Sequence, residues 1–211
     1  MGNTFSMLFG TPFASYDWPD SDGFNAELGE LILSNEKDDT SGRGIRSNAG
    51  GWQSGGNMMT WEHPTIATLK QRFESLVFNV VGELVQKDGR NRQFRLLMDG
   101  WANVCRRGDY NVVHSHPNAM FSLVYYVAAG ESDSDVPYSG LLELLDPRES
   151  ANYIQIQNTI LDARTFIDNQ PGKMVLFPSW VKHMVHPFQG DGTRISIACN
   201  VNVVETNPLK P

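Results

Sequence analysis

Two histidines separated by one residue are the first feature of this sequence that could support chemistry. His114 and His116 flank Ser115, and four of the five histidines of the 211-residue chain lie in two short segments of its second half. Side chains at positions i and i+2 of a strand project from the same face. Two imidazoles placed in this way can bind one metal ion at about 2.0–2.1 Å. The spacing therefore predicts a metal site, although a metal-free pair, buried or exposed, has the same pattern.

An arginine near the end of the chain is the second candidate. If its segment is a strand, Arg194 and Ser196 share one face with Asn200. A buried arginine needs an anion to offset its charge, and its planar fork matches a carboxylate. A structural salt bridge or an exposed arginine at a hairpin end would give the same pattern. Ser122 and Tyr126 also face together, so the Tyr126 hydroxyl can reach the same ligand if that face points inward.

Short strands separated by turn residues must position these side chains. From residue 91 onward, apolar runs alternate with turn signals such as Asp99-Gly100 and Asp146-Pro147, which is typical of a sandwich or barrel. The front segment instead has two amphipathic patterns that predict helices over 24–35 and 64–86. We predict strands over residues 93–98, 101–106, 110–116, 121–128, 140–145, 153–161, 173–177, 181–188 and 193–204.

The expected fold is mainly β: a double-stranded β-helix, or jelly roll, with α-helices packed on one sheet. One domain of residues 1–211 accounts for the length, with a helical front segment, 1–90, that packs on a jelly-roll core, 91–206. The segment 38–56 is rich in Gly, Ser and Asn but lacks the Gly-Lys-Ser/Thr ending of a phosphate loop. We expect an irregular loop there, whose Trp52 could close over a pocket.

The motifs of the β-rich part resemble those of the Fe(II)/2-oxoglutarate dioxygenases, and in particular an uncharacterised branch of 2OG-Fe(II) oxygenases. The Gly-Gly-Trp-Gln-Ser of residues 50–54 fits the same branch. The resemblance rests on His-x-His-Pro at 114–117, Ser-x-x-Tyr-Tyr at 122–126, Asp-Pro-Arg at 146–148, Leu-Phe-Pro-Ser-Trp at 176–180 and Arg-Ile-Ser-Ile at 194–197.

This resemblance implies that the protein uses Fe(II) and the cosubstrate 2-oxoglutarate. The implied activity is an oxygenase that hydroxylates a small-molecule or peptide substrate. His186, three residues after the last implied ligand, would face away from the metal or support the site from behind. The implied metal ligands are His114, His116 and His183, and the implied cosubstrate-binding residues are Arg194, Ser196, Tyr126 and Ser122.

His116 departs from the family pattern, in which a carboxylate completes the ligand set. Three imidazoles leave the metal ion more positive by one charge. Asp146 could supply an oxygen, but Asp-Pro also suits a turn that ends a strand. The paired histidine motifs also resemble those of cupin barrels, which usually have glycine in place of Trp180.

Two alternatives therefore stay open at the level of the sequence. The first is a three-histidine cupin-type enzyme that does not use 2-oxoglutarate and in which Arg194 faces solvent. The second is a non-catalytic metal-binding or ligand-binding barrel. Nothing in the sequence identifies the substrate.

Charge and composition argue against several partners. The net charge is −7 and no block of Lys and Arg occurs, so neither nucleic acid nor a membrane surface is an expected partner. No secretory signal is visible and the longest apolar run, 119–129, is too short to span a bilayer, so we expect a cytoplasmic protein. Cys105 and Cys199 lie in apolar runs and are expected to be buried thiols. A homodimer stays open.

Overall fold

Two antiparallel sheets and two helices make up the fold in a computed structural model, which describes residues 10–39, 47–85, 90–149 and 162–207. The elements are β1 (Ala14–Asp17), α1 (Asp22–Asp38), β2 (Asn48–Ala49), β3 (Trp52–Gln53), η1 (Met58–Thr60), α2 (Pro64–Leu84), β4 (Phe94–Cys105), β5 (Tyr110–His114), β6 (Phe121–Ala128), β7 (Glu131–Ser132), β8 (Leu142–Leu145), β9 (Arg164–Ile167), β10 (Lys173–Pro178), β11 (His183–Val185), β12 (Gly190–Asp191) and β13 (Arg194–Glu205).

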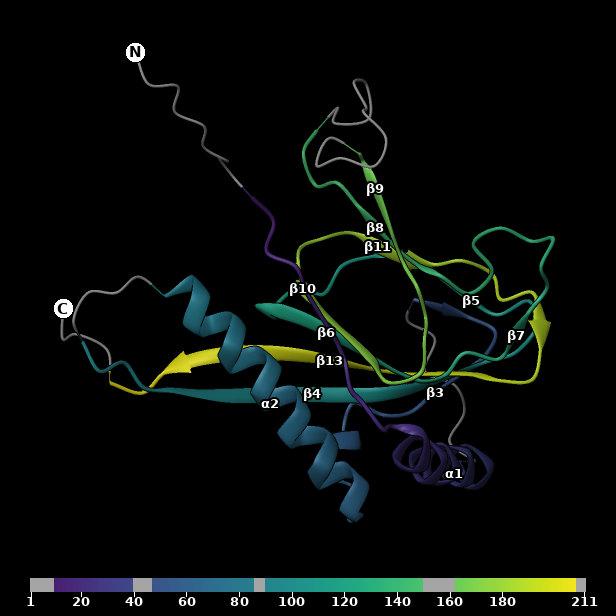
Figure 1. Cartoon of the computed structure of the whole chain (residues 1–211), viewed down its shortest axis with the longest axis horizontal. Coiled ribbons are helices and arrows are strands. Elements are labelled where there is room, and N and C mark those ends of the chain that lie inside the picture. Colours follow the sequence, from purple (N-terminus) through teal and green to yellow (C-terminus); the bar gives the residue numbers. More distant parts are fainter. Residues whose placement is uncertain (1–9, 40–46, 86–89, 150–161, 208–211) are drawn as a thin grey trace.

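The two large sheets face each other, and both helices lie on the outer side of the larger sheet (Figure 1). The larger sheet has the strand order β1-β10-β6-β13-β4-β3, and the smaller has the order β2-β5-β11-β8-β9. A short ribbon of β12 and β7 extends from one end. The mainly β jelly roll with helices on one sheet is therefore confirmed.

Helix and strand predictions succeed where periodicity is strong. The helix predicted over 64–86 is α2, and the strand predicted over 121–128 is β6 with the same bounds. Strand β9 was not predicted. The strand predicted over 153–161 falls entirely on residues that the structure does not describe.

One predicted turn is wrong. Asp99-Gly100 lies inside β4, which continues without a break and pairs with β13 from Phe94 to Cys105. A Cβ atom added at Gly100 would lie 2.6 Å from the Cε atom of Met59, so the missing side chain lets η1 approach the strand. Close approach of another segment is a second reason for glycine in a strand, besides a turn.

Alternation along β6 divides the interior into two parts. Leu123 and Tyr125 belong to the large apolar core between the helices and the larger sheet. Tyr126 belongs to a small apolar cluster between the two sheets, with Val175 and Phe177 of β10. The space between the sheets is therefore filled less completely by apolar side chains, and a cavity lies there.

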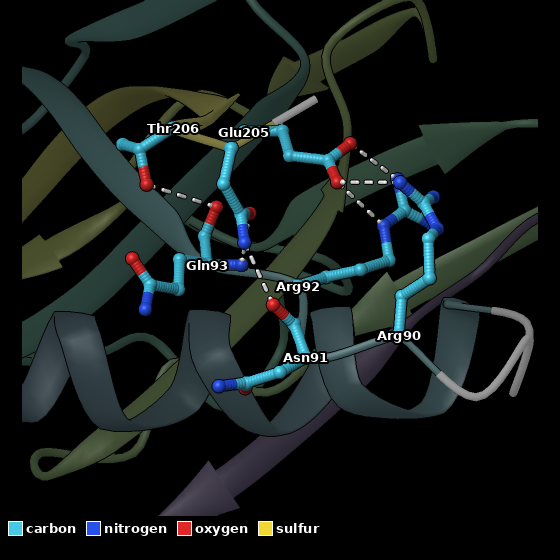
Figure 2. A network of polar contacts seen from close by, with 7 residues as sticks. Arg90, Asn91, Arg92, Gln93, Glu205 and Thr206 are labelled. Carbon is cyan, nitrogen blue, oxygen red and sulfur yellow. Dashed lines mark hydrogen bonds and ion pairs between the residues drawn. The ribbon is translucent and has the colours of Figure 1, made fainter. Parts of the chain in front are cut away.

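A polar network closes the far end of the β4–β13 ribbon (Figure 2). Both nitrogens of the Arg92 fork donate to the Glu205 carboxylate, at 2.9 and 2.7 Å. Beside this pair, the backbone N–H of Gln93 donates to the Asn207 side chain at 2.8 Å. These contacts fix the register of the two longest strands, one of which carries Arg194.

Cys105 and Cys199 are buried free thiols, as expected. Across the described segments, no helix has the length and apolar character needed to cross a membrane.

Candidate metal centre and its cavity

Strand pairing brings the three candidate histidines together. His114 ends β5 and His183 begins β11, and the two residues are direct partners in the antiparallel ladder. His116 lies just beyond β5, where its backbone N–H donates to the Ser179 carbonyl at 2.9 Å. One nitrogen from each ring lies within 4.8 Å of the other two.

A β-bulge aims His114 into the cavity. Asn111 pairs with Val185 and His114 with His183, so β5 has one residue more than β11 between the two pairs. Residues three apart in a regular strand face opposite sides, yet Asn111 and His114 both line the cavity. The predicted regular strand over 110–116 is therefore wrong in detail, although its two histidines do converge.

Backbone carbonyls fix the orientation of two of the rings. The Nδ1 atom of His114 lies 2.7 Å from the Val112 carbonyl, and that of His183 lies 2.9 Å from the Val181 carbonyl. A carbonyl can only accept, so each Nδ1 carries the proton and each Nε2 keeps a lone pair. Such a contact behind the ring is usual for histidines that bind metals.

The free nitrogens stand at the spacing that a shared ion requires. The Nε2 atoms of His116 and His183 are 3.2 Å apart. Two nitrogens that each lie about 2.0–2.1 Å from one ion, at a right or tetrahedral angle, are about 2.8–3.4 Å apart. The pair therefore fits joint coordination without further movement.

Burial keeps these rings neutral. It lowers the pKa of His116 to about 4 and that of His183 to about 3, and it also lowers the pKa of His114. Because a protonated imidazole nitrogen cannot bind a metal, the low pKa values keep the lone pairs available at neutral pH.

Arg194 lies in the same cavity and is 1% exposed. One of its terminal nitrogens donates to the Ser196 hydroxyl at 3.3 Å, and its guanidinium carbon lies 5.5 Å from the centre of the Tyr126 ring. Among the described residues, its Nε atom has no hydrogen-bond partner and its guanidinium forms no ion pair with a carboxylate. A buried guanidinium without a counter-charge is costly, so the site calls for an anion.

Tyr126 supplies a second unused donor. Its hydroxyl is buried and has no hydrogen-bond partner among the residues that the structure describes. Burial raises the pKa of Tyr126 to about 12, although the nearby Arg194 charge acts in the opposite direction. The hydroxyl therefore keeps its proton and can donate to an anion held by Arg194. Fork and phenol together suit a carboxylate.

A family model matches the part of the chain that forms this cavity. Residues 99–200, which contain the three histidines and Arg194, match the model of the family described as "Putative 2OG-Fe(II) oxygenase". Over these residues the chain is similar to this family. The oxygenase is therefore a non-haem Fe(II) enzyme with 2-oxoglutarate as cosubstrate, as its motifs predicted. No curated protein sequence matches the chain.

Solved structures share the fold of this oxygenase at low identity, which by itself establishes the fold alone. The viral collagen prolyl hydroxylase of Paramecium Bursaria Chlorella virus-1, in its 2OG complex, is 14% identical with a TM-score of 0.58, over 90% of this chain and 94% of its own. HygX of Streptomyces hygroscopicus, with nickel and 2-oxoglutarate bound, is 14% identical with a TM-score of 0.56, over 91% and 83%. A Trichoplax adhaerens prolyl hydroxylase, in complex with a hypoxia inducible factor peptide fragment, is 15% identical with a TM-score of 0.57, over 90% and 82%.

The remaining candidate residues of the oxygenase divide between the two ends of the cavity. Ser196 lies in one row with Asn103 and Tyr126, next to Arg194. Ser122 pairs instead with Asn200, and its hydroxyl bonds to that of Ser179 at 3.0 Å. Both serines line the cavity, but Ser122 lies toward the end away from Arg194.

Asp146 does not join the histidines. Its carboxylate bonds to the Arg148 side chain and to the Arg148 backbone N–H, which makes a turn after β8. Within the described residues, the group that can hold a metal contains His114, His116 and His183 and no acid. The structure thus favours the turn over the ligand.

His186 and Trp52 have structural roles. The Nε2 atom of His186 lies 2.6 Å from the Glu143 carboxylate, outside the cavity lining, as expected for a residue facing away from the metal. The expectation that Trp52 closes over a pocket is wrong. Trp52 is buried in the helix-side core, where its indole N–H donates to Asp39 at 2.9 Å.

Asn111 and Ser47 also line the cavity, and sequence reasoning missed both. The parity rule places Asn111 opposite to His114, because the rule cannot show the bulge between them. Trp101 and Asn103, which share a face of β4, do line the cavity.

Proposed function

We propose that this oxygenase hydroxylates a C–H bond of a small molecule or peptide, with Fe(II) held by His114, His116 and His183. The peptide option is supported by the Trichoplax adhaerens enzyme, which was solved with a peptide fragment. Bound Fe(II) and 2-oxoglutarate together supply the oxidising power to insert an oxygen atom from O2, with succinate and CO2 as co-products. The protein contributes binding, orientation and exclusion of water.

In this proposal, Arg194 and Tyr126 hold the distal carboxylate of 2-oxoglutarate. The Arg194 fork donates to the two carboxylate oxygens, and the Tyr126 hydroxyl donates to one of them. Ser196 orients the guanidinium from 3.3 Å. Because Arg194 is 1% exposed, water competes poorly for these hydrogen bonds and the carboxylate has one favoured orientation.

The observation that carries the proposal is a buried arginine without an acidic partner in a cavity shared with three neutral histidines. Each feature alone has structural explanations, whereas together they match a metal ion and a dicarboxylate. A cupin-type enzyme without 2-oxoglutarate predicts that Arg194 faces solvent, which its burial contradicts. A non-catalytic barrel predicts a closed metal site, whereas three protein ligands leave positions free.

The test is anaerobic addition of Fe(II) and 2-oxoglutarate, followed by visible absorption. We expect a weak charge-transfer band in the wild type and its loss in Arg194→Ala. Arg194→Met keeps the volume of the side chain without the charge and serves as a second variant if alanine unfolds the protein. Arg107→Ala, which removes an exposed arginine paired with Asp133, is the matched control and should keep the band. Absence of the band in the wild type contradicts the proposal.

A further inference from the structure

The cavity closes at one end of β13 and opens toward the other. Arg194 is 1% exposed and Ser196 is 5% exposed, whereas Ala198 and Asn200 on the same face are partly exposed. All four residues line the cavity. A ligand that reaches Arg194 therefore enters past Asn200.

The histidines lie between these two ends. Trp101 pairs with Ala198, and its ring centre is 5.5 Å from that of His116. Along the strand, Ala198 lies about 13 Å from Arg194 and about 7 Å from Asn200, at about 3.3 Å per residue. The cosubstrate extends from the metal toward Arg194, so the Asn200 side is left for the molecule that is oxidised.

Asn200 has hydrogen-bonding capacity that the protein does not use. Its side-chain oxygen is buried and accepts no hydrogen bond from the described residues. Two residues along the same face, the Asn202 amide is fully used: it donates to the Asn118 carbonyl and accepts from the Met120 N–H, each at 3.1 Å. Asn202 therefore holds a loop, whereas Asn200 is free to bind a ligand.

Among the described residues that line the cavity, Arg194 alone carries a charge, because the three histidines are neutral. Asp99, the partner of Asn200 in β4, is exposed and is not part of the lining. Once 2-oxoglutarate occupies Arg194 and the metal, a charged substrate group near Asn200 would lose its hydration without gaining a counter-charge from the lining, which is unfavourable. Besides Tyr126 and Trp101, the uncharged polar lining residues are Ser47, Asn103, Asn111, Ser122, Ser196 and Asn200.

We infer that Asn200 is a specificity-determining residue that accepts a hydrogen bond from an uncharged N–H or O–H group of the substrate, next to the C–H bond that reacts. The inference rests on the proposed function, because it assigns the Arg194 side to 2-oxoglutarate. The substrate class is thus a neutral amide or alcohol.

Binding of small probes to the anaerobic Fe(II)–2-oxoglutarate protein tests this inference. The probes are N-methylacetamide, 1,2-propanediol, acetate and methylammonium, and the readout is the shift of the visible band. We expect a saturable shift with a neutral probe and none with the charged ones. The amide and the diol distinguish an N–H from an O–H donor. Asn200→Leu should weaken the neutral probe about tenfold and leave 2-oxoglutarate affinity unchanged.

A matched control is Asn169→Leu. Asn169 is also buried with an unpartnered amide nitrogen, but it lies outside the cavity lining, so probe binding should not change. Thermal unfolding of both variants checks that they fold. A shift with a charged probe alone, no shift with either neutral probe, or wild-type affinity in Asn200→Leu overturns the inference. If the wild-type protein with Fe(II) and 2-oxoglutarate shows no band before any probe is added, the proposed function is overturned instead.

Discussion

In the proposed site, His116 sets the charge of the metal centre. The usual third ligand in this type of site is a carboxylate, which lowers the charge of the complex by one. Here the ligand group contains three histidines, and burial keeps the pKa of His116 near 4. The bound ion therefore keeps its full positive charge, which favours a dianionic cosubstrate.

His116→Asp tests this effect of charge. The variant should still bind Fe(II), because a carboxylate oxygen is an accepted ligand, but 2-oxoglutarate should bind about tenfold more weakly. Band titrations with Fe(II) and with 2-oxoglutarate measure the two affinities separately. His116→Ala, which removes the ligand, should weaken Fe(II) binding itself. Tighter 2-oxoglutarate binding in His116→Asp would contradict the argument.

Gly140 has no side chain, and this leaves room for the Arg194 side chain to pack against its backbone. Its φ angle is +65°, and an added Cβ atom would lie 3.1 Å from the Arg194 Cδ atom and 3.1 Å from a ring carbon of Phe188. Both the backbone angle and the close approach favour glycine. No signal in a single sequence identifies such a glycine.

Gly140→Ala should destabilise the protein by about 1–2 kcal/mol and weaken 2-oxoglutarate binding, with Fe(II) affinity unchanged. Thermal unfolding and the two band titrations measure these effects. Gly23→Ala in α1, where an added Cβ meets nothing within 4 Å, is the control and should not lower stability. Unchanged 2-oxoglutarate affinity in Gly140→Ala would show that Arg194 tolerates the displacement.

At the scale of elements, a buried carboxylate joins three segments on the outer face of the smaller sheet. The Glu143 side chain on β8 is 2% exposed and bonds to Arg164 of β9 and to His186, which follows β11. The hydrogen bonds from Arg164 lower the pKa of Glu143, although burial acts in the opposite direction. This contact fixes β8 and β9 beside the strand that carries His183.

Glu143→Gln should lower the free energy of unfolding by about 2 kcal/mol at pH 7, because it removes hydrogen bonds to a charged group. Because the pKa of Glu143 is lower in the folded state than in the unfolded state, its ionised carboxylate stabilises the fold at a pH above the unfolded-state pKa. This stabilisation is lost as the pH falls through the folded-state pKa. The difference between wild type and variant should therefore shrink on acidification below about pH 4. Urea unfolding at several pH values measures it, with the exposed Asp135→Asn as control. A difference independent of pH would contradict the assignment.

The faces of helices and strands could be predicted from the sequence where the local alternation of apolar and polar residues determines them. Period-two alternation placed Tyr126 and Ser122 on one face of β6, and the structure shows that both residues line the cavity. The bulge in β5 and the glycine within β4 were not predictable, because each depends on a partner segment distant in the chain. Local periodicity contains no information on such partners.

At the scale of the molecule, the fold class and the convergence of the histidines followed from motifs that cover much of the chain. Which end of the cavity closes did not follow, since it depends on how both sheets pack. Exposure along β13 decides it, with Arg194 at the closed end and Asn200 toward the opening. The proposed assignment of a cosubstrate side and a substrate side therefore depends on the structure.

Metal and cosubstrate should stabilise the whole molecule in a linked manner. A ligand at about 100 times its Kd adds about 2.7 kcal/mol to the folded state, which for a chain of this size raises Tm by about 5–10 °C. Fe(II) alone should raise Tm by this amount, because the three neutral imidazoles already lie close enough together to bind it. 2-Oxoglutarate should give a large further shift with Fe(II) present and a small one without it, since the metal supplies part of its binding energy. Anaerobic thermal unfolding measures all four states, and a chelator should reverse both shifts. Arg194→Met should keep the Tm shift caused by Fe(II) and lose the shift caused by 2-oxoglutarate. If 2-oxoglutarate instead gave the wild type equal shifts with and without metal, its binding site would lie away from the histidines.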